Sequence, residues 1–156
     1  MSGKIPEAMA MLYSTTTQYA IRGLSELAGR AGAKKSMMLD ELVEGTTLPR
    51  EFLAKVFQRL VKAGVLTSMK GRGGGFALAR PPHEISLMQI IEAADGDSPV
   101  NGCVIGLDRC DESMACPQHD LYKPIRQRLG DYLETTTLAD LAASLKSKPA
   151  WPARSG

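Results

Sequence analysis

A glycine-rich run between two short apolar segments constrains the fold more than any other feature of this sequence. Residues 65–69 (VLTSM) and 76–79 (FALA) are strand candidates, and residues 71–75 (GRGGG) lie between them. Two short strand candidates on either side of such a turn predict a β-hairpin. Pro81 and Pro82 end it, because proline cannot donate a hydrogen bond to a strand ladder. The segments before the hairpin then decide which fold carries it.

Helical periodicity fills the chain before the hairpin. Apolar residues recur at helical spacing over 14–30, 39–44 and 49–63, and a glycine closes each segment. Pro49 suits the first turn of the third helix. This helix divides into an apolar stripe and a polar, mainly basic face; the stripe consists of Leu53, Val56, Phe57, Leu60 and Val61. The order helix, helix, helix and hairpin predicts a winged helix-turn-helix, a mainly α fold.

The second half of the chain is predicted to be helical around one irregular stretch. Ser86 and Gln89 match a capping box for a helix that ends at Gly96. No period is visible over 96–118, after which helices are predicted from Pro117 to about 134 and over 138–145. In the longer one, apolar residues three and four apart suit packing against another helix.

These segments suggest four parts of the chain. We expect a flexible extension (1–10), a winged helix-turn-helix domain (11–82), a segment with the linker helix, the cysteine-containing loop and the later helices (83–146), and a flexible tail (147–156).

Positive charge is concentrated where the third helix and the hairpin lie. Residues 50–80 carry seven basic and one acidic side chain, whereas 81–120 carry one basic and eight acidic. A basic block on a winged helix favours double-stranded DNA as the partner, with the third helix in the major groove. The candidate contacts are Arg50, Glu51, Lys55, Arg59, Lys62, Lys70 and Arg72. One alternative is that Arg59 pairs with Glu51 or with an acid of the second helix. Another is that the winged helix binds only protein.

A second constellation lies in the irregular stretch, as Cys103-x6-Cys110-x5-Cys116-x2-His119. Thiolates are soft ligands for iron–sulfur clusters and zinc. Cys116 precedes a predicted helix whose N-terminus favours its thiolate, and His119 can add a nitrogen ligand. Zinc sites usually pair cysteines about two to four residues apart, so the wider spacing favours an iron–sulfur cluster. Zinc and three free buried cysteines remain alternatives.

Other features limit the class of protein. Three cysteines support no disulfide framework, and no stretch approaches the roughly 18 apolar residues of a membrane span. We therefore expect a cytoplasmic protein with no membrane partner. The paired acids Asp95 with Asp97 and Asp111 with Glu112 have no nucleophile beside them, so the protein is predicted not to be an enzyme.

Several of these segments resemble the IscR/NsrR-type iron–sulfur-cluster regulators, which are winged-helix transcription factors. The resemblance covers about residues 11–145 and includes the wing and the cysteine loop. The other matching motifs are Tyr19-Ala20-Ile21-Arg22, Phe52-Leu53, Arg59-Leu60, Ala63-Gly64-Val65-Leu66, Ile85-Ser86-Leu87 and Ile90-Ile91.

The resemblance implies a homodimer on a pseudo-palindromic operator, with the helix after the cysteine loop as the dimerisation helix. It implies that Cys103, Cys110, Cys116 and His119 hold a cluster, and Cys-x-x-His resembles the 2Fe–2S members. Gln18 stands where other members carry a carboxylate ligand, which argues against that ligand scheme here. The first cysteine gap is six residues instead of five. A 4Fe–4S cluster is therefore the alternative.

The predicted function is regulation of transcription in response to iron, redox state or nitric oxide. A zinc-bound or thiol-based redox-sensing repressor, and an iron–sulfur cluster carrier, are the rival interpretations.

Overall fold

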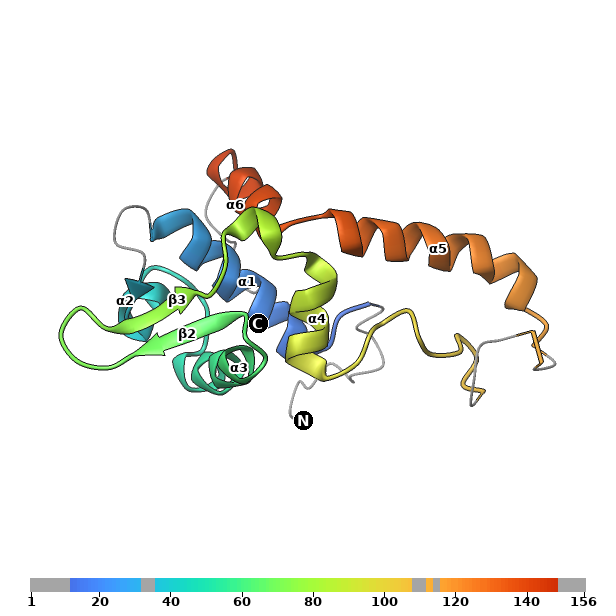
Figure 1. The fold of residues 1–156 in the computed structure, drawn as a ribbon, viewed down its shortest axis with the longest axis horizontal. Helices are drawn as coiled ribbons and strands as arrows, with labels where there is room; N and C mark the ends of the chain where they lie inside the picture. The colour runs from blue at the N-terminus through green and yellow to red at the C-terminus, as the bar shows by residue number, and fades with distance from the viewer. Residues whose placement is uncertain (1–11, 32–35, 108–111, 114–115, 149–156) are drawn as a thin grey trace.

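The computed structural model describes residues 12–31, 36–107, 112–113 and 116–148, and it confirms the mainly α winged helix-turn-helix (Figure 1). The predicted extension, 1–10, and most of the predicted tail lie outside these residues. The elements in chain order are α1 (Thr15–Arg30), β1 (Ser36–Met37), α2 (Leu39–Val43), α3 (Arg50–Lys62), β2 (Leu66–Met69), β3 (Gly75–Leu78), the 3-10 helix η3 (Pro82–Glu84), α4 (Leu87–Asp95), α5 (His119–Thr135) and α6 (Leu138–Lys146).

The core lies where α1, α3 and α4 meet. The predicted stripe of α3 faces it: Leu53, Val56, Phe57 and Leu60 are buried, and Val61 is half-buried. The Phe57 ring also meets the Phe76 ring of β3 edge-on, with centroids 5.1 Å apart. Burial of this stripe fixes α3 against the body of the domain, so its polar face is the one left to solvent.

The wing is a three-stranded antiparallel sheet in the order β1-β3-β2. The hairpin predicted from the glycine-rich run is present, with Leu66 opposite Leu78 and Met69 opposite Gly75. The third strand, β1, was not predicted, because two residues are too short to show a period. A Cβ at Gly75 would lie 2.2 Å from the Met37 carbonyl oxygen of β1. The wing therefore requires glycine at this position.

The second half has the predicted order of helices. Ser86 and Gln89 form the predicted capping box, and α4 ends at Asp95 with Gly96 as its C-cap at φ +82°. Helix α5 begins at His119, two residues later than the proline expected to start it, and it projects from the body of the fold (Figure 1). Among the described residues, no helix combines the length and apolar character needed to cross a membrane.

Candidate DNA interface and thiol site

The predicted basic residues lie on α3 and on the hairpin, and these two elements pack side by side (Figure 1). Lys55 and Lys62 on α3, and Lys70 and Arg72 at the tip of the hairpin, are all exposed. Cations spaced along a helix and a neighbouring hairpin can reach phosphates on both sides of a DNA groove. The exposed cations on these two elements suit the predicted contacts to DNA.

Arg50, the first residue of α3, is engaged within the protein. Its guanidinium contacts the Asp40 carboxylate of α2, and its Nη1 donates to Glu51 Oε1 at 2.9 Å. The hydrogen bond from Arg50 holds the pKa of Asp40 below its ordinary value. Arg50 and Glu51 thus lie together at the N-terminal end of α3, the end from which recognition helices contact base edges.

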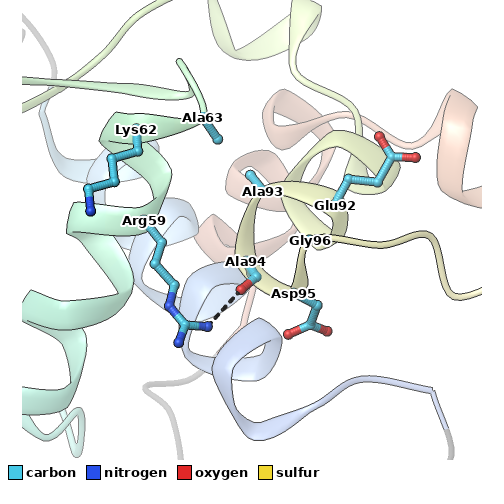
Figure 2. Close-up of a pocket in the computed structure, with 8 residues that line it drawn as sticks. All are labelled: Arg59, Lys62, Ala63, Glu92, Ala93, Ala94, Asp95 and Gly96. Carbon is cyan, nitrogen blue, oxygen red and sulfur yellow. Dashed lines mark hydrogen bonds between the residues drawn. The ribbon is translucent and has the colours of Figure 1, made fainter.

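Arg59 is exposed, and its guanidinium is directed toward α4 (Figure 2). Its Nη1 donates to the Ala94 carbonyl oxygen at 3.2 Å, across a groove of about 440 Å³ between the C-terminal ends of α3 and α4 (Figure 2). It contacts neither Glu51 nor an acid of α2. Lys62 lines the same groove but points away from α4 (Figure 2). The two side chains of α3 thus point in different directions (Figure 2).

Sequence reasoning missed a residue that fixes the turn before α3. Arg22 of α1 donates from Nη2 to Thr47 Oγ1 at 2.8 Å, and its guanidinium lies 5.9 Å from the centre of the Tyr19 ring. The Tyr19 ring in turn meets Phe52 of α3 at 5.1 Å. Tyr19 and Arg22 lie three positions apart, which places both on one face of α1. That spacing was the available signal, but nothing in it identified Thr47 as a partner.

The structure brings Cys103 and Cys116 together. The pKa of the Cys103 thiol lies below its ordinary value because its sulfur accepts hydrogen bonds. The donors are, in order of effect, the backbone N–H groups of Ile105 and Leu107, the Cys116 thiol and the Gly106 N–H. Both cysteines are half-buried, and no disulfide bond joins them. N–H groups directed at a sulfur stabilise a thiolate, whether it is free or bound to a metal.

The remaining predicted ligands are Cys110 and His119. Cys110 lies outside the described residues. The backbone N–H of His119 donates to the Cys116 carbonyl oxygen at 3.3 Å. Within the described part of the chain, no three His, Cys, Asp or Glu residues are grouped to hold a metal. The thiol pair fits one half of a thiolate-ligated site, and the full ligand set stays a prediction.

Helix α5 anchors the loop that carries these cysteines. Arg126 donates from Nη2 to the Gly102 carbonyl oxygen at 2.8 Å, and Lys123 pairs with Glu112 at 3.4 Å. Arg126 also lies over the Tyr122 ring, at 5.4 Å from its centre. These contacts fix the backbone beside Cys103 to the helix that begins after Cys116.

Comparison with known families matches residues 13–144 to Rrf2, described as iron-dependent transcriptional regulators. The chain belongs to the Rrf2 family. A candidate HTH-type transcriptional regulator of Aquifex aeolicus is 32% identical over 133 residues, which cover 84% of this chain and 91% of that protein. The HTH-type transcriptional regulator IscR of Vibrio campbellii is 27% identical over 131 residues, which cover 84% of this chain and 77% of that protein. The solved structure of CymR, the global cysteine regulator of B. subtilis, is 25% identical with a TM-score of 0.71, covering 84% and 95%.

Membership of the Rrf2 family confirms the IscR-type resemblance and the winged-helix fold. Rrf2 proteins are transcriptional regulators that bind DNA and commonly form dimers. The family is one of regulators, which are generally not enzymes.

Proposed function

We propose that this Rrf2 protein is a cytoplasmic homodimeric regulator that binds a pseudo-palindromic operator and responds to iron, redox state or nitric oxide. Helix α3 enters the major groove through its N-terminal residues, Arg50 and Glu51, with Lys55 and Lys62 on phosphates. Lys70 and Arg72 at the hairpin tip reach the flanking groove. The exposure of these cations and their position on α3 and the wing support this assignment.

The sensor is the cysteine loop. The observation that carries this proposal is the contact between Cys103 and Cys116, with backbone N–H groups aimed at the Cys103 sulfur. We assign an iron–sulfur cluster, 2Fe–2S in preference to 4Fe–4S, to Cys103, Cys110, Cys116 and His119. When bound, such a cluster supplies redox chemistry that depends on hydrogen bonds to its sulfurs and on its exposure.

The residues around the loop determine how it can signal. Arg126 holds the loop backbone at Gly102, and the loop joins α4 directly at Gly96. A change at Cys103 therefore acts on a segment tied to α5 on one side and to α4 on the other. Operator affinity changes with the state of the loop if the two states hold α3 differently. The cluster can shift this equilibrium only by binding one of the two states more tightly than the other.

The uncovered face of α5 supports the homodimer. Leu121, Ile125 and Tyr132 are 77%, 57% and 49% exposed, whereas Leu133 at the end of the helix is buried against α4. An apolar stripe that the described residues leave exposed is typical of a helix that packs against a partner. A second copy of α5 provides a matching stripe through twofold symmetry.

Anaerobic purification tests the sensor directly. A cluster protein shows absorption across about 320–460 nm together with sulfide and iron, and the iron content separates 2Fe–2S from 4Fe–4S. The DNA for this test is a duplex that the protein itself selects from a random library. If a C103A/C110A/C116A protein binds that duplex as the loaded wild type does, the proposed sensing is wrong. A colourless wild type without sulfide after reconstitution also contradicts it.

The same thiol contact favours a second candidate, a thiol-based redox regulator. A lowered Cys103 pKa beside Cys116 suits an attacking thiolate and a resolving thiol. The Cys103 thiolate cleaves the O–O bond of hydrogen peroxide and becomes a sulfenic acid with release of hydroxide, and the Cys116 thiol then displaces water to form the disulfide. Peptide mapping after treatment with hydrogen peroxide distinguishes the two. A Cys103–Cys116 disulfide in a colourless protein supports the thiol regulator.

A further inference from the structure

The C-terminal turn of α4 is bound from two sides. From α3, Arg59 Nη1 donates to the Ala94 carbonyl oxygen at 3.2 Å. From the start of α1, Ser14 Oγ donates to Asp95 Oδ1 at 2.6 Å and Thr17 Oγ1 donates to Asp95 Oδ2 at 2.8 Å. The last turn of α4 thus contacts both α3, the proposed DNA-reading helix, and the N-terminal end of α1.

The cysteine loop leaves α4 at this same turn. Helix α4 ends at Asp95 with Gly96 as its C-cap, and Cys103 lies nine positions after Ala94 in the sequence. The intervening chain is held by its own contacts: Ser98 Oγ donates to Met88 Sδ at 3.3 Å, and Asn101 Nδ2 donates to Asp97 Oδ1 at 3.2 Å. A displacement of Cys103 can therefore be transmitted to Ala94 and Asp95 through a short segment that these hydrogen bonds hold in place.

The bond from Arg59 responds to the geometry of that turn. The last carbonyls of a helix have no partner within the helix, and a cation is favoured beside them. Arg59 satisfies the Ala94 carbonyl only while the last turn of α4 keeps its place beside α3. Thr17 is fully buried, so its bond to Asp95 restricts the same turn from the side of α1. A discrete contact of this kind is either made or broken.

We infer that Arg59 is a positioning residue that couples the cysteine loop to α3, with Asp95 and Thr17 holding the turn through which the coupling passes. This inference rests on the proposed function, since it requires both operator binding by α3 and a sensing event at Cys103. Arg59 then contributes to regulation by its contact with Ala94, and its contribution to phosphate binding is small.

Lys62 provides a matched control. It lies three residues after Arg59 on the same helix and lines the same groove, but it points away from α4 (Figure 2). A cation at Lys62 that neutralises a phosphate strengthens binding in every state of the loop. Its loss must lower the affinity of the metal-free and the loaded protein by the same factor.

The experiment measures affinity for the selected duplex in the loaded and metal-free forms of wild type, R59M, K62M and T17V. Methionine keeps an unbranched stem of similar length but cannot donate to Ala94. Allosteric couplings commonly change affinity about 5- to 150-fold. For each protein we take the ratio of the tighter to the weaker of the two affinities. We expect this ratio to fall toward 1 in R59M and to decrease in T17V. In K62M the ratio is expected to stay at the wild-type value while both affinities drop.

Two readouts make the result decisive. R59K can still donate to the Ala94 carbonyl, so it should restore most of the wild-type ratio. By linkage the coupling of binding free energies is reciprocal, so the duplex should change the iron retained at equilibrium against a chelator in wild type but not in R59M. A wild-type ratio of 1 overturns the proposed sensing and this inference together. A wild-type ratio that R59M retains overturns this inference alone.

Discussion

Gly23 of α1 faces the ring of Phe57 in α3 so closely that a methyl group on it would lie 2.8 Å from the ring carbon Cε1. The same methyl would lie 2.8 Å from Cδ1 of Leu53. Both side chains are fully buried, so neither can move without disturbing the core. We expect G23A to lower the free energy of unfolding by about 1–3 kcal/mol, as overpacked core substitutions do. Urea denaturation measures this.

Gly29 is the control on the same helix. A methyl group there would meet nothing within 4 Å, so G29A should raise the free energy of unfolding by roughly 0.5–1 kcal/mol through helix propensity alone. If G23A were as stable as G29A, α1 and α3 would not pack as closely at Gly23 as the structure shows.

Local sequence patterns predicted most of the fold. The stripe of α3 and the capping box at Ser86 each depend on residues a few positions apart, so the sequence shows them directly. Strand β1 shows no such pattern, because its pairing of Ser36 with Ala77 joins segments far apart in the chain. The distant partner, and not the two residues themselves, makes it a strand.

The candidate site was predictable in its residue types and less so in its contacts. Charge and spacing identified the basic face and the cysteines, since both are visible as compositional clusters. The bonds from Arg59 to Ala94 and from Thr17 to Asp95 join residues 35 and 78 positions apart. Polar groups with distant partners leave no periodic signal, so the role of Arg59 required the structure.

Helix α5 should be required for dimer formation. Ile125 is 57% exposed on the apolar face of this helix, and a carboxylate buried there without a partner would disfavour association. We expect I125E to shift the protein from dimer to monomer in light scattering. Gln127 is also exposed on α5 but two positions away, on another face. Q127E should stay dimeric, and an I125E protein that stays dimeric would exclude this face as the interface.

Arg72 at the wing tip should contribute to the salt dependence of DNA binding. Each phosphate that a side chain neutralises adds about −0.9 to the slope of log affinity against log salt concentration. R72A should therefore weaken binding to the selected duplex and flatten the slope by about that amount per contact. Lys148 is exposed just after the end of α6, and K148A should leave the slope unchanged. An R72A protein with the wild-type slope would remove Arg72 from the interface.

Cys103 should react with alkylating reagents at lower pH in the folded protein than in the unfolded chain. Backbone N–H groups of Ile105 and Leu107, with the Cys116 thiol, lower its pKa by stabilising the thiolate. Thiolate is the reactive form, so the rise of the alkylation rate with pH should begin earlier in the reduced, metal-free protein. Peptide-resolved mass spectrometry with iodoacetamide measures the rate at Cys103, and the same peptide in urea gives the reference. In C116A the rise should move part of the way back toward the urea profile, because the other hydrogen bonds remain. Coincident profiles for folded and unfolded wild type would show that the loop does not hold the thiolate.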